Sequence, residues 1–132
     1  MTRSISARRA LCGVLVIAGA FAAVLLLTPR ASAAGTQVLR LSAKPHMVLR
    51  FSTNHLKAHR GRVKLVMHNP RNAGMAHGIA ISGHGIHKVG KIVGPGHTST
   101  VTVMIKKKGK YTFFCPVPGH EQAGMKGTLA VS

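Results

Sequence analysis

Hydrophobic and polar residues alternate in short runs along most of this chain. The alternation is clearest in Arg62–His68, where Val63, Leu65 and Met67 occupy every second position, and in Ser99–Ile105. A period of two places alternate side chains on opposite faces of a β-strand, so the apolar face of each run is expected to line a core. Gly, Pro, Asn and Ser interrupt the runs at the short intervals that are typical of turns between strands.

The pattern predicts a series of short strands joined by turns. They are expected at Val38–Leu41, Met47–Phe51, Arg62–His68, His77–Ile81, Ile86–Val93, Ser99–Ile105, Tyr111–Cys115 and Thr128–Val131. No window beyond the N-terminal segment has the periodicity of a long amphipathic helix, and Asn54–Gly61 is expected to form one turn or a loop. Short strands without helices predict an all-β sandwich or barrel in a single domain.

The first 33 residues have a different composition. A basic start is followed by an apolar run over residues 10–27 and by the small-residue sequence Ala31-Ser32-Ala33. These are the three parts of a secretory signal, although the run is also close to the minimum length of a membrane-spanning helix. We therefore expect residues 1–33 to form a hydrophobic helix, as a signal peptide or a membrane anchor. Residues 34–132 are expected to form one exported domain, periplasmic or extracellular.

The charge of the chain is strongly unbalanced. Lys and Arg number 19 against a single acidic residue, Glu121, which gives a formal net charge of +18. Such a surface favours acidic partner proteins or an anionic membrane. Nucleic acid is the other common partner of a basic protein, but the chain has one Tyr, no Trp and no recognised nucleic-acid-binding motif. We expect no nucleic-acid binding, and we expect a monomer.

A lysine cluster stands apart from the rest of this charge. The sequence IKKKGK places Lys106–Lys108 and Lys110 around one glycine, which predicts a solvated hairpin turn. Lys110 precedes Cys115 by about 17 Å along an extended strand, at roughly 3.3 Å per residue. The cluster is therefore expected at the end of the fold opposite Cys115.

Cys115 is the only cysteine of the predicted domain. A domain of this size has a modest core, and the disulfides that usually stabilise exported domains require a second cysteine. A lone thiol in an oxidising compartment is reactive unless something occupies it. A bound metal ion would occupy the thiol and stabilise the fold as well.

The residues after Cys115 supply further metal donors. His120 and Met125 follow at equal steps of five residues, in a stretch that Pro and Gly residues exclude from regular strand pairing. Thiolate, imidazole and thioether groups together favour copper over magnesium or calcium, and zinc gains little from a thioether. Two His and one Cys with a weak axial Met form the ligand set of a blue-copper electron-transfer site.

A second histidine is needed to complete such a set. His77 is the best candidate because it opens a predicted strand directly after an Asn-Pro loop, at the same end of a sandwich as the Cys115 loop. His68 is a weaker candidate because it precedes that loop. His84 and His87 lie in a glycine-rich turn that is expected to be a solvated hairpin, with a second metal site as the alternative. We expect His46, His55, His59 and His97 at the surface.

The segments AHGIAI and GKYTFFCPVPGHEQAGMKGTLAV resemble the cupredoxins, the plastocyanin and azurin family. The resemblance is strong from about Val63 to the C-terminus and rests on strand pattern alone in Gln37–Phe51. Four residues separate Cys115 from His120, and four separate His120 from Met125, which is similar to the auracyanin and rusticyanin spacing. Plastocyanin has a shorter first interval and azurin a shorter second one.

The resemblance implies a Greek-key β-sandwich that binds one copper ion. It implies His77, Cys115 and His120 as equatorial ligands, Met125 as the axial ligand, and one-electron transfer without substrate chemistry. Many members have Asn directly after the first His, whereas this chain has Gly78, whose N–H group can still reach the sulfur. Pro116 removes another donor after Cys115 and leaves the N–H group of Val117 as an expected one.

Two functions remain open at this level. The first is an exported blue-copper electron carrier that exposes His120 as its electron port to redox partner proteins. The alternative is a copper storage or delivery protein that uses the same site. We do not expect an enzyme, because one carboxylate and a closed four-ligand site leave no open coordination position.

Overall fold

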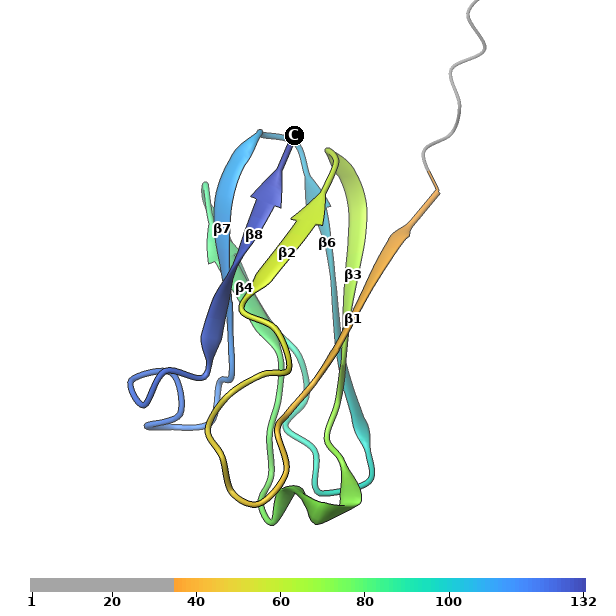
Figure 1. The fold of residues 1–132 in the computed structure, drawn as a ribbon. Coiled ribbons are helices and arrows are strands. Elements are labelled where there is room, and N and C mark those ends of the chain that lie inside the picture. The colour runs from red at the N-terminus through yellow and green to blue at the C-terminus, as the bar shows by residue number, and fades with distance from the viewer. Residues whose placement is uncertain (1–34) are drawn as a thin grey trace, which may run out of the picture. The chain divides into compact units, whose positions relative to one another are not determined.

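The computed structural model describes residues 35–132, which form a β-sandwich (Figure 1). The predicted signal peptide or anchor at residues 1–33 lies outside the described residues. In the described part of the chain, no helix has the length and apolarity needed to cross a membrane.

Two sheets make up the sandwich. A three-stranded sheet has the order β1-β3-β6, and a five-stranded sheet has the order β2-β8-β7-β4-β5. The strands are β1 (Gln37–Ser42), β2 (His55–Ala58), β3 (Gly61–His68), β4 (Ala80–Gly83), β5 (Ile86–Val89), β6 (Thr98–Ile105), β7 (Gly109–Phe114) and β8 (Lys126–Val131), with a short 3-10 helix η1 (Arg71–Ala73). β1 pairs with β3 and β2 pairs with β8 in parallel, whereas the other pairs are antiparallel. The predicted all-β Greek-key sandwich is confirmed.

Alternation along the strands determines the core, as the sequence pattern predicts. Val63, Leu65 and Met67 of β3 are fully buried. In β7 and its continuation, Tyr111, Phe113 and Cys115 are buried in the same hydrophobic cluster. The metal donor Cys115 is therefore anchored at the end of a core strand, because its side chain faces the space between the two sheets.

Several predicted strands and one predicted loop need correction. The strand predicted at His77–Ile81 begins only at Ala80, and His77 forms an isolated bridge with Val93. Met47–Phe51 is not a strand: only Phe51 forms an isolated bridge, with Ala43, and Met47 has a positive φ of 58°. Part of Asn54–Gly61, expected as a turn or loop, forms β2 instead. β2 is an edge strand that pairs with β8 only. Because β8 is distant in sequence, the local pattern of residues does not reveal this pairing. The strand predicted at Ile86–Val93 ends at Val89.

The two ends of the sandwich carry different loops. One end contains the β3–β4 loop with η1 and the β7–β8 loop. The other end, called the distal end below, contains the turns at residues 59–60, 84–85 and 106–108 (Figure 1). The described chain also enters the sandwich near the distal end, because the Gln37 side chain exchanges two hydrogen bonds with the backbone of His59.

Candidate metal centre

Cys115 ends the core strand β7 and begins the β7–β8 loop. Its side chain is 1% exposed, and its N–H group donates a hydrogen bond of 3.0 Å to the carbonyl of Met125. This bond continues the β7–β8 pairing by one step beyond Phe114 and Lys126. The two ends of the loop are therefore held together beside the thiol.

The loop between these ends is compact. The N–H group of Met125 donates to the carbonyl of His120 at 2.9 Å, and that of His120 donates to the carbonyl of Val117 at 3.1 Å. A guanidinium nitrogen of Arg50 donates to the carbonyl of Ala123 from the β1–β2 loop. Backbone and side-chain hydrogen bonds thus hold His120 against Cys115.

His77 comes from a separate part of the chain. Its backbone forms an isolated bridge with Val93, through hydrogen bonds of 3.0 and 2.8 Å in the two directions. Asn69 braces the same region, because its buried amide donates to the carbonyls of Met75 and Val93 at 3.0 Å each. Sequence reasoning did not identify Asn69 as a supporting residue. Its position in an Asn-Pro turn was the available signal, but nothing local predicts its two distant acceptors.

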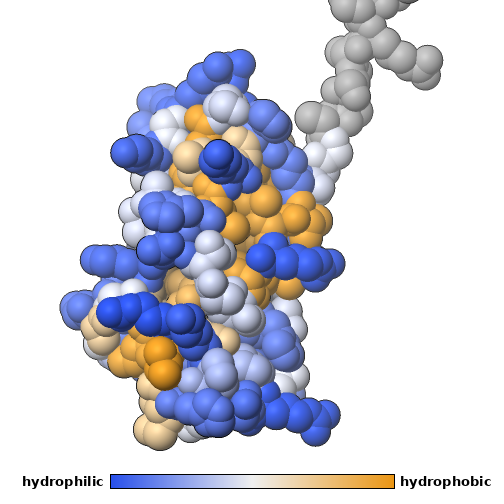
Figure 2. Space-filling view, viewed as in Figure 1, coloured by the Kyte–Doolittle hydropathy of each residue, from blue (hydrophilic) through white to orange (hydrophobic). Residues whose placement is uncertain are grey.

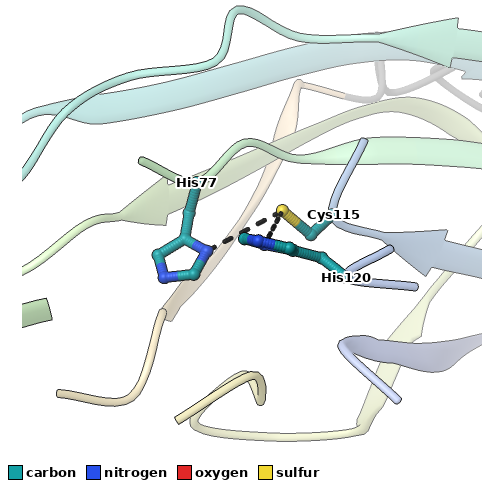
Figure 3. Close-up of side chains that lie close together, drawn as sticks. All are labelled: His77, Cys115 and His120. Atoms are coloured by element: carbon teal, nitrogen blue, oxygen red, sulfur yellow. Dashed lines mark hydrogen bonds between the residues drawn. The ribbon is translucent and has the colours of Figure 1, made fainter. Parts of the chain in front are cut away.

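The structure brings three of the predicted ligands together. The donor atoms of His77, Cys115 and His120 lie within 4.8 Å of one another. The Nδ1 atoms of His77 and His120 lie 3.9 and 3.5 Å from the Cys115 sulfur, and both face it in Figure 3. Met125 is fully buried in the same hydrophobic cluster as Cys115. The rival candidate His68 is exposed and is not part of the group.

Burial favours the neutral forms of two of these side chains, His77 and Cys115. Burial lowers the pKa of His77, and the neighbouring His120 lowers it further. Burial raises the pKa of the Cys115 thiol, although N–H groups of Gly78 and Val117 oppose this effect. A neutral imidazole is ready to bind a metal, whereas the thiol has to release its proton to the solvent on binding.

The residues present fit a copper ion. Two imidazole nitrogens and one sulfur converge at a buried point, and these are the donors that copper prefers. Nε2 of His77 is buried with no hydrogen-bond partner among the described residues, and Nδ1 has only the sulfur at 3.9 Å. Nδ1, the ring nitrogen that faces the sulfur, therefore has no conventional hydrogen-bond partner that would compete with a metal ion for its lone pair. Together with Met125, the three residues form a candidate type 1 copper site.

The sulfur also has the backbone donor that the sequence suggests. The N–H group of Gly78 lies 3.5 Å from Sγ, and that of Val117 acts on the thiol as well. A Cβ atom on residue 78 would lie 3.0 Å from Cγ of Pro116. Gly78 and Pro116 are therefore matched to each other, and glycine permits the close approach that brings this N–H group to the sulfur.

The remaining histidines lie away from this centre. His84 and His87 are exposed on the β4–β5 hairpin, as predicted, and the ring of His84 packs on Tyr111 with centroids 4.9 Å apart. His46, His55, His59 and His97 are exposed, also as predicted. Among residues 35–132, the cluster at His77, Cys115 and His120 is the only metal-competent group of His, Cys or acidic side chains.

Comparison with known proteins connects this arrangement to a family. Residues 37–132 match the model of the family described as copper binding proteins, plastocyanin/azurin family. An azurin of Pseudomonas fluorescens biotype C is 50% identical over 44 residues, which span 31% of this chain and 34% of the azurin. The chain is thus matched over about a third of the length of this curated relative.

Solved structures share the fold. Auracyanin B is similar with a TM-score of 0.63 and 24% identity, covering 73% of this chain and 88% of that chain. Auracyanin A of Chloroflexus aurantiacus, a "blue" copper protein, has a TM-score of 0.59 and 18% identity, covering 74% and 100%. A copper nitrite reductase from Nitrosomonas europaea has a TM-score of 0.62 and 18% identity, covering 74% of this chain but only 41% of that chain.

Proposed function

The chain belongs to the plastocyanin/azurin family of copper-binding proteins, and on this premise we propose that it is an exported carrier of single electrons. His77, Cys115 and His120 would hold one copper ion, with the thioether of Met125 as a further, weak ligand. Copper supplies the one-electron couple between Cu(II) and Cu(I). The residues of the chain hold the copper ion, shield it from water and provide the route by which the electron reaches the surface.

The observation that carries the proposal is the preorganised donor cluster. The donor atoms lie within 4.8 Å of one another, and the loop that bears two of the donors is closed by its own hydrogen bonds. A group held in this way changes little when the charge of its metal changes, so the reorganisation that accompanies electron transfer is small. Such a rigid site suits an electron carrier better than a protein that must release its ion.

Limited access to the cluster argues against an enzyme. His77 is fully buried, and Cys115 is 1% exposed. Only the ring of His120 is partly exposed, in a loop whose Pro118, Gly119 and Ala123 are exposed. Small residues at this place let a partner approach the His120 ring, which serves as the electron port.

The surface around the port fits a docking partner with apolar and acidic groups. Met47 and Val48 are 62% and 43% exposed in the β1–β2 loop, whose Arg50 binds the ligand loop at Ala123. Figure 2 shows hydrophobic side chains at the lower left, over this loop, with hydrophilic ones around them. Because basic residues outnumber acidic ones 19 to 1, an acidic redox protein is the partner that the charge favours.

A copper titration tests the proposal on the purified exported protein. Added Cu(II) is expected to give an intense blue thiolate-to-copper absorption band that dithionite bleaches and an oxidant restores. Cys115→Ser is expected to abolish the band. Pale protein that loses copper to a mild chelator would instead support the alternative function, copper storage or delivery.

A further inference from the structure

Basic residues surround the distal end of the sandwich. Lys106–Lys108 occupy the β6–β7 turn, Lys110 follows in β7, and Arg60 lies in the β2–β3 turn, and all of these side chains are exposed. The other end of the sandwich, called the metal end below, carries the candidate copper site. The only acidic residue of the sequence, Glu121, follows His120 in the β7–β8 loop at this end. The C-terminal residue Ser132 also lies at the distal end. It follows β8, which β7 and β4 separate from β5 in the five-stranded sheet.

A groove opens beside these turns, between the sheet edges formed by β5 and β6. One part of the groove has a volume of about 400 Å³ and continues into a hollow of about 170 Å³. Ile86 and Met104 line both parts and form a shared apolar floor. The rim is basic and consists of Arg62, Lys88, Lys106 and Lys107.

The floor of the groove is accessible and the rim side chains are long. Met104 is 49% exposed, and it lies directly opposite Arg62 in the β3–β6 pairing. Lys and Arg have apolar stems that can be buried together with the apolar floor, while their charged ends stay in contact with polar groups. This combination is typical of surfaces that lie in the interfacial region of a bilayer.

The lysine turn is fixed relative to the groove. The hydroxyl of Tyr111 donates to the carbonyl of Lys107 at 2.9 Å, and His84 packs on the Tyr111 ring. Gly109 has a φ of 131°, and a Cβ atom there would lie 2.7 Å from Nε2 of His84. The cations and the apolar floor are therefore presented together, without a loop that has to order on binding.

The polypeptide enters the fold at this same end. Gln37 begins β1 opposite Val63, two residues from the start of β3, and it is hydrogen-bonded to His59. The 34 residues that precede the described part include the apolar run at residues 10–27. The groove therefore lies at the end of the sandwich where the described chain begins.

From the rim charge, the apolar floor and the point of chain entry, we propose that the distal groove docks the protein on an anionic phospholipid bilayer. Arg62, Lys88, Lys106 and Lys107 contact lipid phosphates, and Met104 and Ile86 enter the headgroup layer. The metal end then faces away from the membrane, because β7 separates Lys110 from Cys115 by about 17 Å at roughly 3.3 Å per residue. The inference does not depend on the proposed electron transfer.

A single-stranded nucleic acid fits the groove less well than a bilayer. Proteins that bind such strands stack bases on exposed aromatic rings, whereas Tyr111 is 2% exposed and the floor is aliphatic. A soluble acidic polymer could reach the rim charges, but it would gain nothing from Met104. The test below separates these occupants.

Matched charge variants test the electrostatic part of the proposal. The exported protein is mixed with vesicles of phosphatidylglycerol and phosphatidylcholine, or with vesicles of phosphatidylcholine alone, and sedimented. Lys106→Gln with Lys107→Gln is expected to weaken the binding that depends on phosphatidylglycerol by about 30-fold, since each lysine near an anionic leaflet contributes a factor of about 5. The control Lys44→Gln with Lys91→Gln removes the same charge from exposed sites elsewhere. Equal losses in both variants would overturn the groove as the docking surface.

Two methionines at opposite ends test the orientation. Carbene labelling, read by mass spectrometry, is expected to fall at Met104 on phosphatidylglycerol vesicles and to stay unchanged at Met47, which is 62% exposed. Phosphatidylcholine vesicles are expected to protect neither methionine. Protection of Met47 by the vesicles would overturn the proposal. Protection of Met104 by heparin or polyglutamate, but not by vesicles, would also overturn it. Labelling is run on copper-free and copper-loaded protein, so a failed copper site does not alter the outcome.

Discussion

Gly78 and Pro116 pack against each other beside the thiol of Cys115, so closely that a Cβ atom on residue 78 would lie 3.0 Å from the proline ring. The contact joins the two chain segments that carry His77 and Cys115. It also places the N–H group of Gly78 at 3.5 Å from the sulfur. The pair therefore holds together the two segments that carry these predicted ligands.

Gly78→Ala is expected to lower the reduction potential of the copper-loaded protein. The new methyl group pushes residue 78 away from Pro116 and lengthens the bond from N–H to sulfur, and a less stabilised thiolate favours Cu(II). The loss of one hydrogen bond contributes about 1 kcal/mol, which is about 40 mV for one electron. A potentiometric titration measures the shift.

A double-mutant cycle with Pro116→Ala tests the contact between the two residues by its effect on unfolding free energy. The smaller side chain leaves room for the methyl group, so Gly78→Ala is expected to cost about 1 kcal/mol less in unfolding free energy when both changes are present. Additive effects of the two substitutions would show that their contact does not hold the segments together.

Met125→Leu is expected to retain copper and change its potential. The side chain is fully buried, and a Met-to-Leu change nearly conserves volume, so its effect on stability should stay below about 1.5 kcal/mol. Removal of the thioether takes away a weak donor to the copper ion, and because this donor tunes the potential of such sites, the potential is expected to change. Cyclic voltammetry with the buried Met67→Leu as control checks this result. Equal potentials in all three proteins would exclude Met125 as a ligand.

Asn69→Ala is expected to lower both stability and copper affinity. The Asn69 amide donates to the carbonyls of Met75 and Val93, and Val93 in turn pairs with the backbone of His77. The substitution removes two hydrogen bonds, and the Val93 carbonyl keeps only the bond from the His77 N–H group. At about 1 kcal/mol for each lost bond, the cost is about 2 kcal/mol. Urea unfolding and copper competition measure the two effects. Asn72→Ala, an exposed change in η1, is expected to leave both unchanged.

The metal-free protein is expected to lose stability as the pH falls below about 6.5. Burial holds the pKa of His77 below its ordinary value, so the unfolded chain binds a proton that the folded chain excludes, and protonation favours unfolding. Cys115 has the opposite effect on the pH dependence of stability, because burial raises its pKa. Above about pH 8.5, the unfolded chain releases the thiol proton more readily than the folded chain, so stability is expected to fall as the pH rises. Urea unfolding over this pH range measures both losses of stability. His77→Gln is expected to remove the loss at acidic pH. A loss at acidic pH that persists unchanged in His77→Gln would assign it to other groups.

The strands whose sequences alternate were predictable because burial on one face leaves a period of two in the chain. Gly61–His68 and Thr98–Ile105 lie in this group, and their predicted apolar positions form the core. His55–Ala58 was not predictable in the same way, since its short run becomes a strand only through pairing with β8. Met47–Phe51 failed for the opposite reason: its apolar residues remain largely at the surface, in a loop held against η1 by the bond from Met47 to Ala73.

The sequence by itself determined the donor chemistry of this protein and its place in the copper-binding family. The spacing of Cys115, His120 and Met125 in a loop rich in Pro and Gly depends on local chain geometry, so it can be read from neighbouring residues. Only the tertiary structure decided that His77, 38 residues before Cys115, faces the same sulfur, and that Asn69 and Gly78 support it. It also decided that Met104, Ile86 and the lysine turn share one groove at the distal end. These relationships depend on which strands become neighbours, and strand pairing between distant segments is a property of the whole packed chain.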